Sequence, residues 1–336
     1  MGLPYGYDSA VRGLLVGVIW LAACYTPVIP ANVLCSRSGD CPEGQTCTAG
    51  KCELAIGTLP PDGALSPDGP IIPPASDRDH DGIPDVSDNC PDVANPDQTA
   101  NEDGDKFGDV CDPCPQISDN APIDTDHDGI GDACDPNPAA HDTVWLFEGF
   151  HKGLPPWARS VNWTAVGDKL QVIASGNNTN NIPDPSEYFI PPLLPPSGTL
   201  DNFGVTATVL VTQMMGNNGD QSIGVEVYDG ATTVQKGVEC ELDQDPAGSN
   251  SILWLVDGFN SGVNKKAAFA WTTNTEYRIT MVRHGSTYTC TVVGPGGTTQ
   301  TTSGTSAVLP RDSSAVDVWA FGMTAQVGSV QIIGTP

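Results

Sequence analysis

The sequence has few basic residues. It contains 14 Lys and Arg against 41 Asp and Glu, so the formal net charge is −27 over 336 residues. Nucleic-acid binding depends on clustered Lys and Arg that neutralise phosphates, and the sequence has no such cluster. We therefore expect neither nucleic acid nor an anionic lipid surface as a direct partner. Divalent cations are the expected counter-charge.

The sequence also lacks the motifs of the common enzyme classes and any apolar run long enough to cross a bilayer. It has no Ser/His/Asp nucleophile motif, phosphate-binding glycine loop or dinucleotide fingerprint. One apolar run, Gly13 to Ala23, has 11 residues after Arg12, which is typical of the h-region of a secretory signal. We expect an exported protein that is not an enzyme.

The apolar run ends in Leu21-Ala22-Ala23-Cys24, which resembles the bacterial lipobox. The resemblance implies that residues 1–23 are a signal peptide and that Cys24 receives lipid after cleavage. Tyr25 after the cysteine implies the outer membrane in that family. We therefore expect an outer-membrane lipoprotein at the cell surface. An ordinary signal peptide with a free Cys24 is the alternative.

The chain has 11 cysteines, and setting Cys24 apart leaves ten for five disulfides, which indicates an oxidising compartment. Residues 24–55 form a small disulfide-rich module whose pairing stays open; its other cysteines are Cys35, Cys41, Cys47 and Cys52. A zinc site is the alternative for these four, although no C-x2-C knuckle is present. Residues 56–76 are rich in proline and glycine and are expected to form a partly extended linker.

Three aspartate-rich segments between residues 77 and 135 have the spacing of metal ligands. The first begins Asp77-Arg78-Asp79-His80-Asp81-Gly82, and the third begins Asp124-Thr125-Asp126-His127-Asp128-Gly129. Calcium takes six to eight oxygen ligands, and carboxylates on alternate residues converge where a glycine lets the backbone turn tightly. In the second segment Asn101, Asp103 and Asp105 keep the spacing, but Lys106 replaces the glycine. We expect the second site to be weaker or differently wound.

Three further motifs accompany these segments: Asp88-Asn89-Cys90-Pro91, Asn95-Pro96-Asp97-Gln98 and Gly108-Asp109-Val110-Cys111-Asp112. Together the motifs closely resemble thrombospondin type 3 repeats. The resemblance implies calcium ions wrapped by irregular chain over residues 77–138, with Cys90 paired to Cys111 and Cys114 to Cys134. The calcium ligands that it implies are Asp77, Asp79, Asp81, Asp85, Asp88, Asn101, Asp103, Asp105, Asp109, Asp112, Asp124, Asp126, Asp128, Asp132 and Asp135.

An acidic disordered linker is the alternative for this segment. Residues 77–135 carry 18 Asp and Glu against two Lys and Arg, and large apolar residues are sparse. The positions of the glycines and the spacing of the cysteines favour calcium loops. Without calcium we expect the segment to expand, because its charges repel and only the cysteine cross-links hold the chain.

From Val144 onward, apolar and polar residues alternate with a period of two, which is typical of β-strands. One such face is Phe203, Val205, Ala207, Val209 and Val211. We predict twelve to fourteen short strands in one two-sheet sandwich over residues 141–336, and a mainly β protein as a whole. Cys240 and Cys290 lie on two of these segments and remain to pair with each other.

The start of this domain, Phe147-Glu148-Gly149-Phe150, and its end, Trp319-Ala320-Phe321-Gly322, resemble concanavalin A-like jelly-roll domains of the laminin-G/glucanase type. The resemblance implies binding of carbohydrate or protein more often than catalysis. Trp254, Trp271 and Trp319 would stack on sugar rings if exposed, and would pack in the core otherwise.

The segment 239–245, Glu239-Cys240-Glu241-Leu242-Asp243-Gln244-Asp245, places four carboxylates on one strand face. A solvated face or an added calcium site is the expectation. Catalysis by Glu239, Glu241 or Asp243 in a glycan hydrolase is the alternative. The order of the acids differs from the glucanase signature, so that family's catalytic roles do not transfer.

The sequence thus predicts a calcium-binding surface lipoprotein that presents a β-sandwich recognition domain, for adhesion to glycan or extracellular matrix. An extracellular glycan hydrolase and a purely structural envelope protein are the alternatives.

Overall fold

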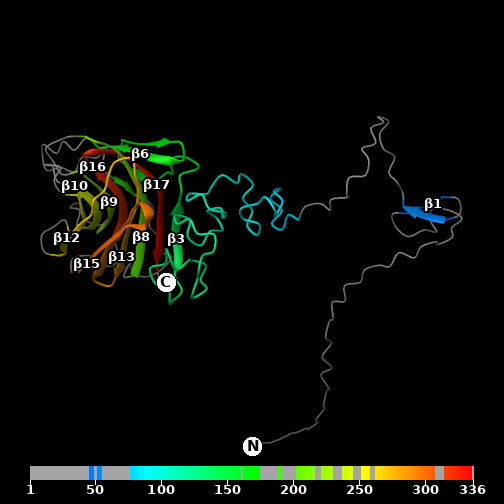
Figure 1. Cartoon of the computed structure of the whole chain (residues 1–336), viewed down its shortest axis with the longest axis horizontal. Coiled ribbons are helices and arrows are strands. Elements are labelled where there is room, and N and C mark those ends of the chain that lie inside the picture. Colours follow the sequence, from blue (N-terminus) through cyan, green and yellow to red (C-terminus); the bar gives the residue numbers. More distant parts are fainter. Residues whose placement is uncertain are drawn as a thin grey trace, which may run out of the picture. The chain divides into compact units, whose positions relative to one another are not determined.

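Figure 1 shows the computed structural model of the chain. It describes residues 45–48, 51–54, 76–159, 162–174, 188–190, 202–215, 221–229, 237–244, 251–257, 262–306 and 314–334. The chain divides into two compact units, residues 1–71 and residues 72–336. None of the described residues forms a helix that is long and apolar enough to cross a membrane.

The described residues of the first unit form an antiparallel hairpin of β1 (Gln45–Thr48) and β2 (Lys51–Leu54). Cys47 and Cys52 stand opposite each other in its register. The predicted signal peptide, the lipidation site Cys24, Cys35, Cys41 and most of the linker lie outside the described residues.

The second unit contains a β-sandwich of two antiparallel sheets, with fifteen strands among the described residues. The seven-stranded sheet has the order β12-β11-β10-β9-β16-β7-β4. Its strands are β4 (Ala158–Arg159), β7 (Tyr188–Ile190), β9 (Gln221–Asp229), β10 (Gly237–Gln244), β11 (Ser251–Asp257), β12 (Asn264–Ala268) and β16 (Ser314–Phe321).

The eight-stranded sheet has the order β15-β14-β13-β8-β17-β6-β5, and β3 also pairs with β17. Its strands are β3 (Thr143–Glu148), β5 (Trp163–Val166), β6 (Lys169–Ile173), β8 (Asn202–Met214), β13 (Glu276–His284), β14 (Thr287–Val293), β15 (Thr299–Thr305) and β17 (Met323–Gly334). The short 3-10 helix η2 (Pro295–Gly297) joins β14 to β15.

The core lies between the two sheets and consists of the apolar faces that the alternation predicts. On β8 the five residues from Phe203 to Val211 that alternate along the strand are all buried. β10 contributes Val238 and Leu242 from the opposite sheet. Since successive side chains of a strand point to opposite faces, the period of two determines which residues enter the core. The predicted fold class, a mainly β protein with a two-sheet sandwich, is confirmed.

A disulfide between Cys240 on β10 and Cys290 on β14 joins the two sheets across the core. Both residues are fully buried, and they are 50 residues apart in the sequence. In the chain-entropy account, closing a loop of this length stabilises the folded state by about 4 kcal/mol. The disulfide therefore holds the sheets against separation.

The Asp-rich segment before β3 is irregular chain, and its part after residue 100 packs on the outer face of the eight-stranded sheet, whereas the first part projects away from the sandwich (Figure 1). Thr208 on β8 and Ser329 on β17 point away from the core, yet both are buried, and their hydroxyls lie 2.9 Å apart. The side-chain amide of Gln116 donates to Ser329 Oγ at 2.8 Å. The Arg278 guanidinium on β13 donates to the backbone carbonyl of Gln116 at 3.2 Å. The segment and the sandwich therefore share one body.

Candidate metal centres in the Asp-rich repeats

The Asp-rich segment is a threefold structural repeat, because the same hydrogen bonds recur at equivalent positions. The backbone N–H of Arg78 donates to Asp85 Oδ1 at 2.9 Å. The equivalent bonds of the second and third repeats, Glu102 to Asp109 and Thr125 to Asp132, are both 2.8 Å. The repeats begin at Asp77, Asn101 and Asp124, and each is closed eight residues later by one carboxylate.

A second family of bonds joins the fifth residue of each repeat to a backbone N–H fourteen residues later. A carboxylate oxygen of Asp81 accepts the Asn95 N–H at 2.8 Å. The equivalent pairs are Asp105 with the Asp119 N–H at 3.1 Å and Asp128 with the Asp142 N–H at 2.5 Å. One aspartate at the same place in each repeat therefore also positions the chain fourteen residues further on.

The ligand loops wind through the left-handed backbone region. His80 and His127 have φ of 63° and 66°, and Gly82 and Gly129 have φ of 97° and 95°. The N–H of each of these glycines turns back to the first aspartate of its loop, at 3.2 Å in the first repeat and 3.0 Å in the third. Glycine adopts this conformation with little steric strain, whereas a residue with a Cβ does not.

The second loop is wound differently. Its left-handed residue is Gly104, with φ of 73°, and Lys106 stands where the other repeats have glycine. The Lys106 N–H donates to Asn120 Oδ1 at 3.0 Å instead of turning back to the first residue of the loop. The second loop therefore lacks the hydrogen bond that joins the glycine N–H to the first residue of the loop in the other two repeats.

Three groups of carboxylates converge at these loops, and within each group the ligand atoms lie within 4.8 Å of one another. That separation matches two oxygens on opposite sides of one calcium ion, since calcium–oxygen distances are about 2.4 Å. The groups are Asp77, Asp79 and Asp81; Asp103, Asp105 and Asp112; and Asp124, Asp126 and Asp128.

The carboxylates divide their oxygens between the loop and the centre of the group. Asp79 Oδ1 accepts the Asp81 N–H at 3.1 Å, and Asp103 Oδ1 accepts the Asp105 N–H at 3.0 Å. The second oxygen of both residues is buried and has no hydrogen-bond partner among the described residues, and neither oxygen of Asp126 has one. Buried carboxylate oxygens are costly unless paired, so this arrangement fits a bound cation.

Four of the remaining predicted ligands use their side-chain oxygens in contacts within the protein. Asp85, Asp109 and Asp132 close the repeats and use both of their oxygens in protein contacts. Asn101 bonds within its own loop, accepting the Gly104 N–H at 2.7 Å and donating to the Asp105 carbonyl at 2.8 Å.

Asp88 and Asp135 hold the position in their repeats that Asp112 holds in the second. Each has one buried oxygen without a partner among the described residues. Asp142 lies beside Asp135 and was missed by the sequence analysis. Its place fourteen residues after Asp128 was the available signal.

Crowding of the acids opposes their ionisation. Burial, reinforced by the neighbouring Asp103 and Asp105, raises the pKa of Asp112 to about 6. Burial, reinforced by Asp142 and Asp128, raises the pKa of Asp135 to about 6. A divalent cation among these carboxylates would favour their charged form.

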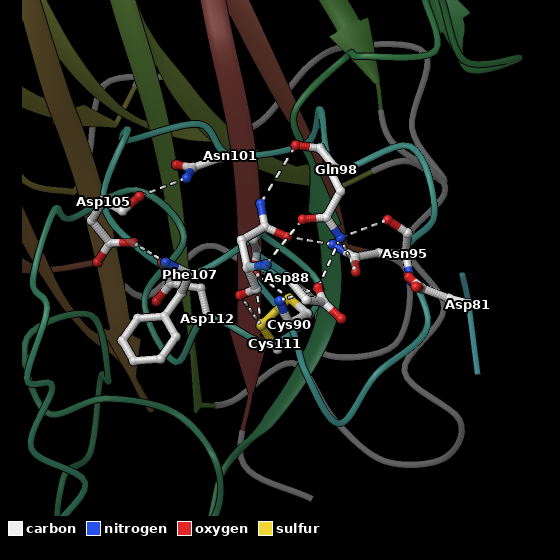
Figure 2. The surroundings of a disulfide bond; sticks show 12 residues. Asp81, Asp88, Cys90, Asn95, Gln98, Asn101, Asp105, Phe107, Cys111 and Asp112 are labelled. Atoms are coloured by element: carbon white, nitrogen blue, oxygen red, sulfur yellow. Dashed lines mark hydrogen bonds between the residues drawn. A yellow bond between two sulfur atoms is a disulfide. The ribbon is translucent and has the colours of Figure 1, made fainter. Parts of the chain in front are cut away.

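The Asn-Pro-Asp-Gln motif is hydrogen-bonded to the residues beside the Cys90–Cys111 disulfide, as Figure 2 shows. Gln98 donates to Asp88 Oδ1 at 2.8 Å and accepts the Asn89 N–H at 2.9 Å. Cys90, directly after Asn89, forms a disulfide with Cys111, and a second disulfide joins Cys114 to Cys134. These cross-links compensate for the small apolar core of the segment.

The carboxylates of residues 239–243 lie on β10 and point away from the core. The expectation that this face is solvated is wrong, since Glu241 and Asp243 are 2% and 4% exposed. Asp245 lies outside the described residues. Trp271 packs in the core, whereas Trp254 and Trp319 are half-buried on the outer face of the seven-stranded sheet.

Comparison with solved structures finds matches at low sequence identity and low TM-score. A structure of peanut lectin with a nine-residue peptide has 12% identity and a TM-score of 0.44, and the match covers 58% of this chain and 98% of that one. Lectin II from Ulex europaeus has 11% identity and a TM-score of 0.41, covering 57% and 100%. The GH43 protein BlXynB from Bacillus licheniformis has 11% identity and a TM-score of 0.43, covering 56% and 39%. Similarity at this level does not indicate what the sandwich binds.

Comparison with curated proteins finds no match. The family model of the thrombospondin type 3 repeat matches residues 75–98 and 123–137, which contain the first and third ligand loops. The second loop, between these matches, keeps the same closing and linking hydrogen bonds. The Asp-rich segment of this chain is therefore a set of thrombospondin type 3 repeats.

Proposed function

We propose that this chain is an exported, calcium-binding surface lipoprotein whose repeats bind Ca²⁺ and whose β-sandwich recognises a glycan or a matrix component. The calcium assignment rests on the different roles of the two oxygens within one carboxylate. One oxygen of Asp79 or Asp103 fixes the loop, while the other is buried in a group of acids without a partner among the described residues.

The chemistry of the donor set favours calcium over other divalent ions. All side-chain donors of the three groups are carboxylate oxygens. Zinc sites use Cys and His as their usual ligands, and magnesium demands near-octahedral geometry with several waters. An irregular loop that supplies many oxygens suits calcium, and extracellular modules of this kind bind it with Kd on the order of 10⁻⁴ to 10⁻³ M.

The oxidising chemistry of the chain supports export. The described residues contain three disulfides, and such bonds persist in extracellular and periplasmic compartments. The lipobox-like segment before Cys24 supports the lipid anchor and the outer-membrane location. Calcium is available at millimolar concentration at many cell surfaces, which matches the affinity expected of the repeats.

The calcium assignment is tested by scanning calorimetry with millimolar calcium and with chelator. We expect a higher melting temperature with calcium, and a smaller calcium effect in Asp126→Asn, because Asp126 belongs to the third carboxylate group and neither of its oxygens has a hydrogen-bond partner among the described residues. Asp97→Asn is the matched control: Asp97 lies in the same segment but is exposed. Identical melting with calcium and with chelator would refute the assignment.

The recognition function is tested by a glycan array probed with the purified protein in the presence and absence of calcium. Selective binding would support a lectin-like adhesin. A blank array would move the assignment to a matrix protein as partner, or to a purely structural role in the envelope.

Hydrolysis of a glycan is the second candidate function, and one observation favours it. Burial, reinforced by Asp257, raises the pKa of Glu239 to about 7. Glycosidases use a carboxylic acid of raised pKa beside a second carboxylate. Release of reducing ends by the wild type that disappears in Glu241→Gln would establish this function. Absence of turnover with a saccharide that binds would exclude it for that saccharide.

A further inference from the structure

A cavity of about 170 Å³ lies between the Asp-rich repeats and the outer face of the eight-stranded sheet. The centre of its floor is a row of polar side chains across four strands, in the order Gln331, Thr206, Thr280 and Thr291. The residues next to them along the strands, such as Ile332, are buried in the core, so this row points outward. The middle of the floor therefore offers hydroxyl and amide groups to a ligand.

The roof of the cavity is formed by the end of the third repeat together with Gln116. Roof and floor are in contact at one end, since a Cβ at Gly204 would lie 2.7 Å from Pro136 Cγ. Elsewhere the cavity is open, because Thr280 on the floor is only half-buried and Ala133 on the roof is exposed. A small molecule can therefore enter from solvent.

Arg278 on β13 lines the cavity and is a cation without an acidic partner among the described residues. Its guanidinium makes one hydrogen bond there, to the backbone carbonyl of Gln116, and no ion pair. Burial lowers the pKa of Arg278. A guanidinium has five N–H donors, so most of them remain for a ligand. In a chain with 41 acids and 14 Lys and Arg, a buried base without an acid calls for an external anion.

Gln116 supplies an unsatisfied acceptor to the same cavity. It is 7% exposed, and its side-chain Oε1 is buried without a hydrogen-bond partner among the described residues. A buried acceptor is destabilising when unpaired, so this oxygen favours a ligand that donates. The hydroxyls of Thr206 and Thr280 lie 3.1 Å apart, and since one donates to the other, one hydroxyl hydrogen of the pair is available as well.

We propose that this cavity binds a uronic acid residue of a glycan, with Arg278 holding the carboxylate and Gln116 Oε1 accepting a hydrogen bond from a sugar hydroxyl. This inference deepens the proposed recognition function and rests on it. A guanidinium matches a carboxylate with two parallel N–H···O bonds, and the threonine hydroxyls of the floor suit the remaining sugar hydroxyls.

The two unsatisfied groups distinguish this ligand from other small molecules. A neutral sugar would leave the Arg278 charge unpaired, and a metal ion would be repelled by it. Sulfate and fully ionised phosphate would pair with Arg278 but offer no donor to Gln116 Oε1. A uronic acid residue carries a carboxylate and hydroxyl donors on one ring, so it satisfies both groups at once.

The size of the cavity limits the ligand to one small residue. Sites that enclose drug-sized ligands measure about 300 to 1,000 Å³, which is larger than this cavity. The rest of the glycan would therefore lie outside it. Asp135 also lines the cavity and opposes an anion, and calcium among the carboxylates of the third repeat would offset that charge. The titrations are therefore made in calcium.

The test is titration calorimetry of the full chain with matched methyl glycosides. The methyl glycosides of glucuronic and galacturonic acid should bind, whereas those of glucose and galactose, which differ only in lacking the carboxylate, should bind at least about tenfold more weakly, as loss of a charge-assisted hydrogen bond predicts. Acetate and glycine are included as carboxylates without a sugar ring and should also bind more weakly.

Two variants assign the binding to the cavity. Arg278→Met removes the charge and should weaken uronoside binding at least about tenfold, and Gln116→Met removes the acceptor and should weaken it about fivefold. Lys265→Met is the matched control, because Lys265 is an exposed base on β12 of the other sheet. It removes one positive charge and should bind as the wild type does. The melting temperature of each variant shows whether the fold is kept.

The inference is overturned if neither uronoside binds at millimolar concentration, or if the neutral glycosides, acetate or glycine bind as tightly as the uronosides. It is also overturned if Arg278→Met and Gln116→Met both keep the wild-type affinity. The glycan array separates this inference from the recognition function. Neutral glycans bound on the array without uronoside binding would leave the recognition function standing, and a blank array without uronoside binding would remove both.

Discussion

Calcium should stabilise the sandwich through the second and third repeats and not through the first. The second repeat reaches the sandwich through Gln116, whose amide bonds Ser329, and through Asp109, which lies 3.2 Å from His151 Nε2. The third reaches it through Pro136, which lies against Gly204 on β8. The contacts described for the first repeat are internal to the Asp-rich segment.

The matched perturbations are Asp79→Asn, Asp103→Asn and Asp126→Asn, which replace the same position of each repeat. We take Kd on the order of 10⁻⁴ to 10⁻³ M and about 2 mM calcium. One site then adds roughly 0.7 to 1.8 kcal/mol to the free energy of unfolding of the sandwich, if the site is coupled to it. For a domain of this size that is roughly 1 to 7 °C in melting temperature per site.

Scanning calorimetry of the sandwich transition, with calcium and with chelator, measures the effect. Asp103→Asn and Asp126→Asn should each remove part of the calcium-dependent rise in melting temperature, whereas Asp79→Asn should leave that rise unchanged. Equal losses in all three variants would show that the first repeat is coupled as strongly as the others. No loss in any would show that the docked repeats do not support the sandwich.

The disulfide, Glu239 and Gln116 give three further predictions. Replacing both Cys240 and Cys290 with alanine should lower the free energy of unfolding in denaturant by about 4 kcal/mol, because the disulfide closes a 50-residue loop; a loss under 1 kcal/mol would contradict this. Because the folded-state pKa of Glu239 is raised to about 7, its contribution to stability should decline as pH rises from about 4.5 to 7. Glu239→Gln should therefore match the wild type near pH 4.5 and be more stable above pH 7 at constant calcium, and parallel pH profiles would count against the shift. Gln116→Ala should cost about 1 kcal/mol, since Ser329 keeps its bond to Thr208, and unchanged unfolding in calcium would show that this contact contributes nothing.

The strand faces of the sandwich could be predicted from the sequence because they depend on local alternation. Every residue of the predicted face from Phe203 to Val211 is in the core. The periodicity of two is set by the pleat, and it needs no knowledge of which strands are neighbours. The metal-ligand spacing is local for the same reason, since each group is drawn mostly from five consecutive residues.

What the sequence could not show depends on contacts between distant segments. Glu226 and Asp317 join Glu239 on one face only because β9 lies between β10 and β16. Their separation of about 90 residues gives no local signal. The burial of Glu241, expected to be solvated, has the same origin. The roles of Asp85 and its equivalents depend on hydrogen bonds to the backbone seven residues earlier, which spacing alone does not distinguish from metal ligation.

The bond from Asp81, Asp105 and Asp128 to the chain fourteen residues ahead gives the segment a modular construction. Each unit of 23 or 24 residues contains this bond between the same two positions, so duplicating or deleting a whole unit leaves the bond of every other unit in place. An insertion of a few residues between the two positions would break the bond of that unit. Because the second and third units contact the sandwich, adding or removing a whole unit at the start of the segment would change its length by a fixed increment and leave those contacts in place.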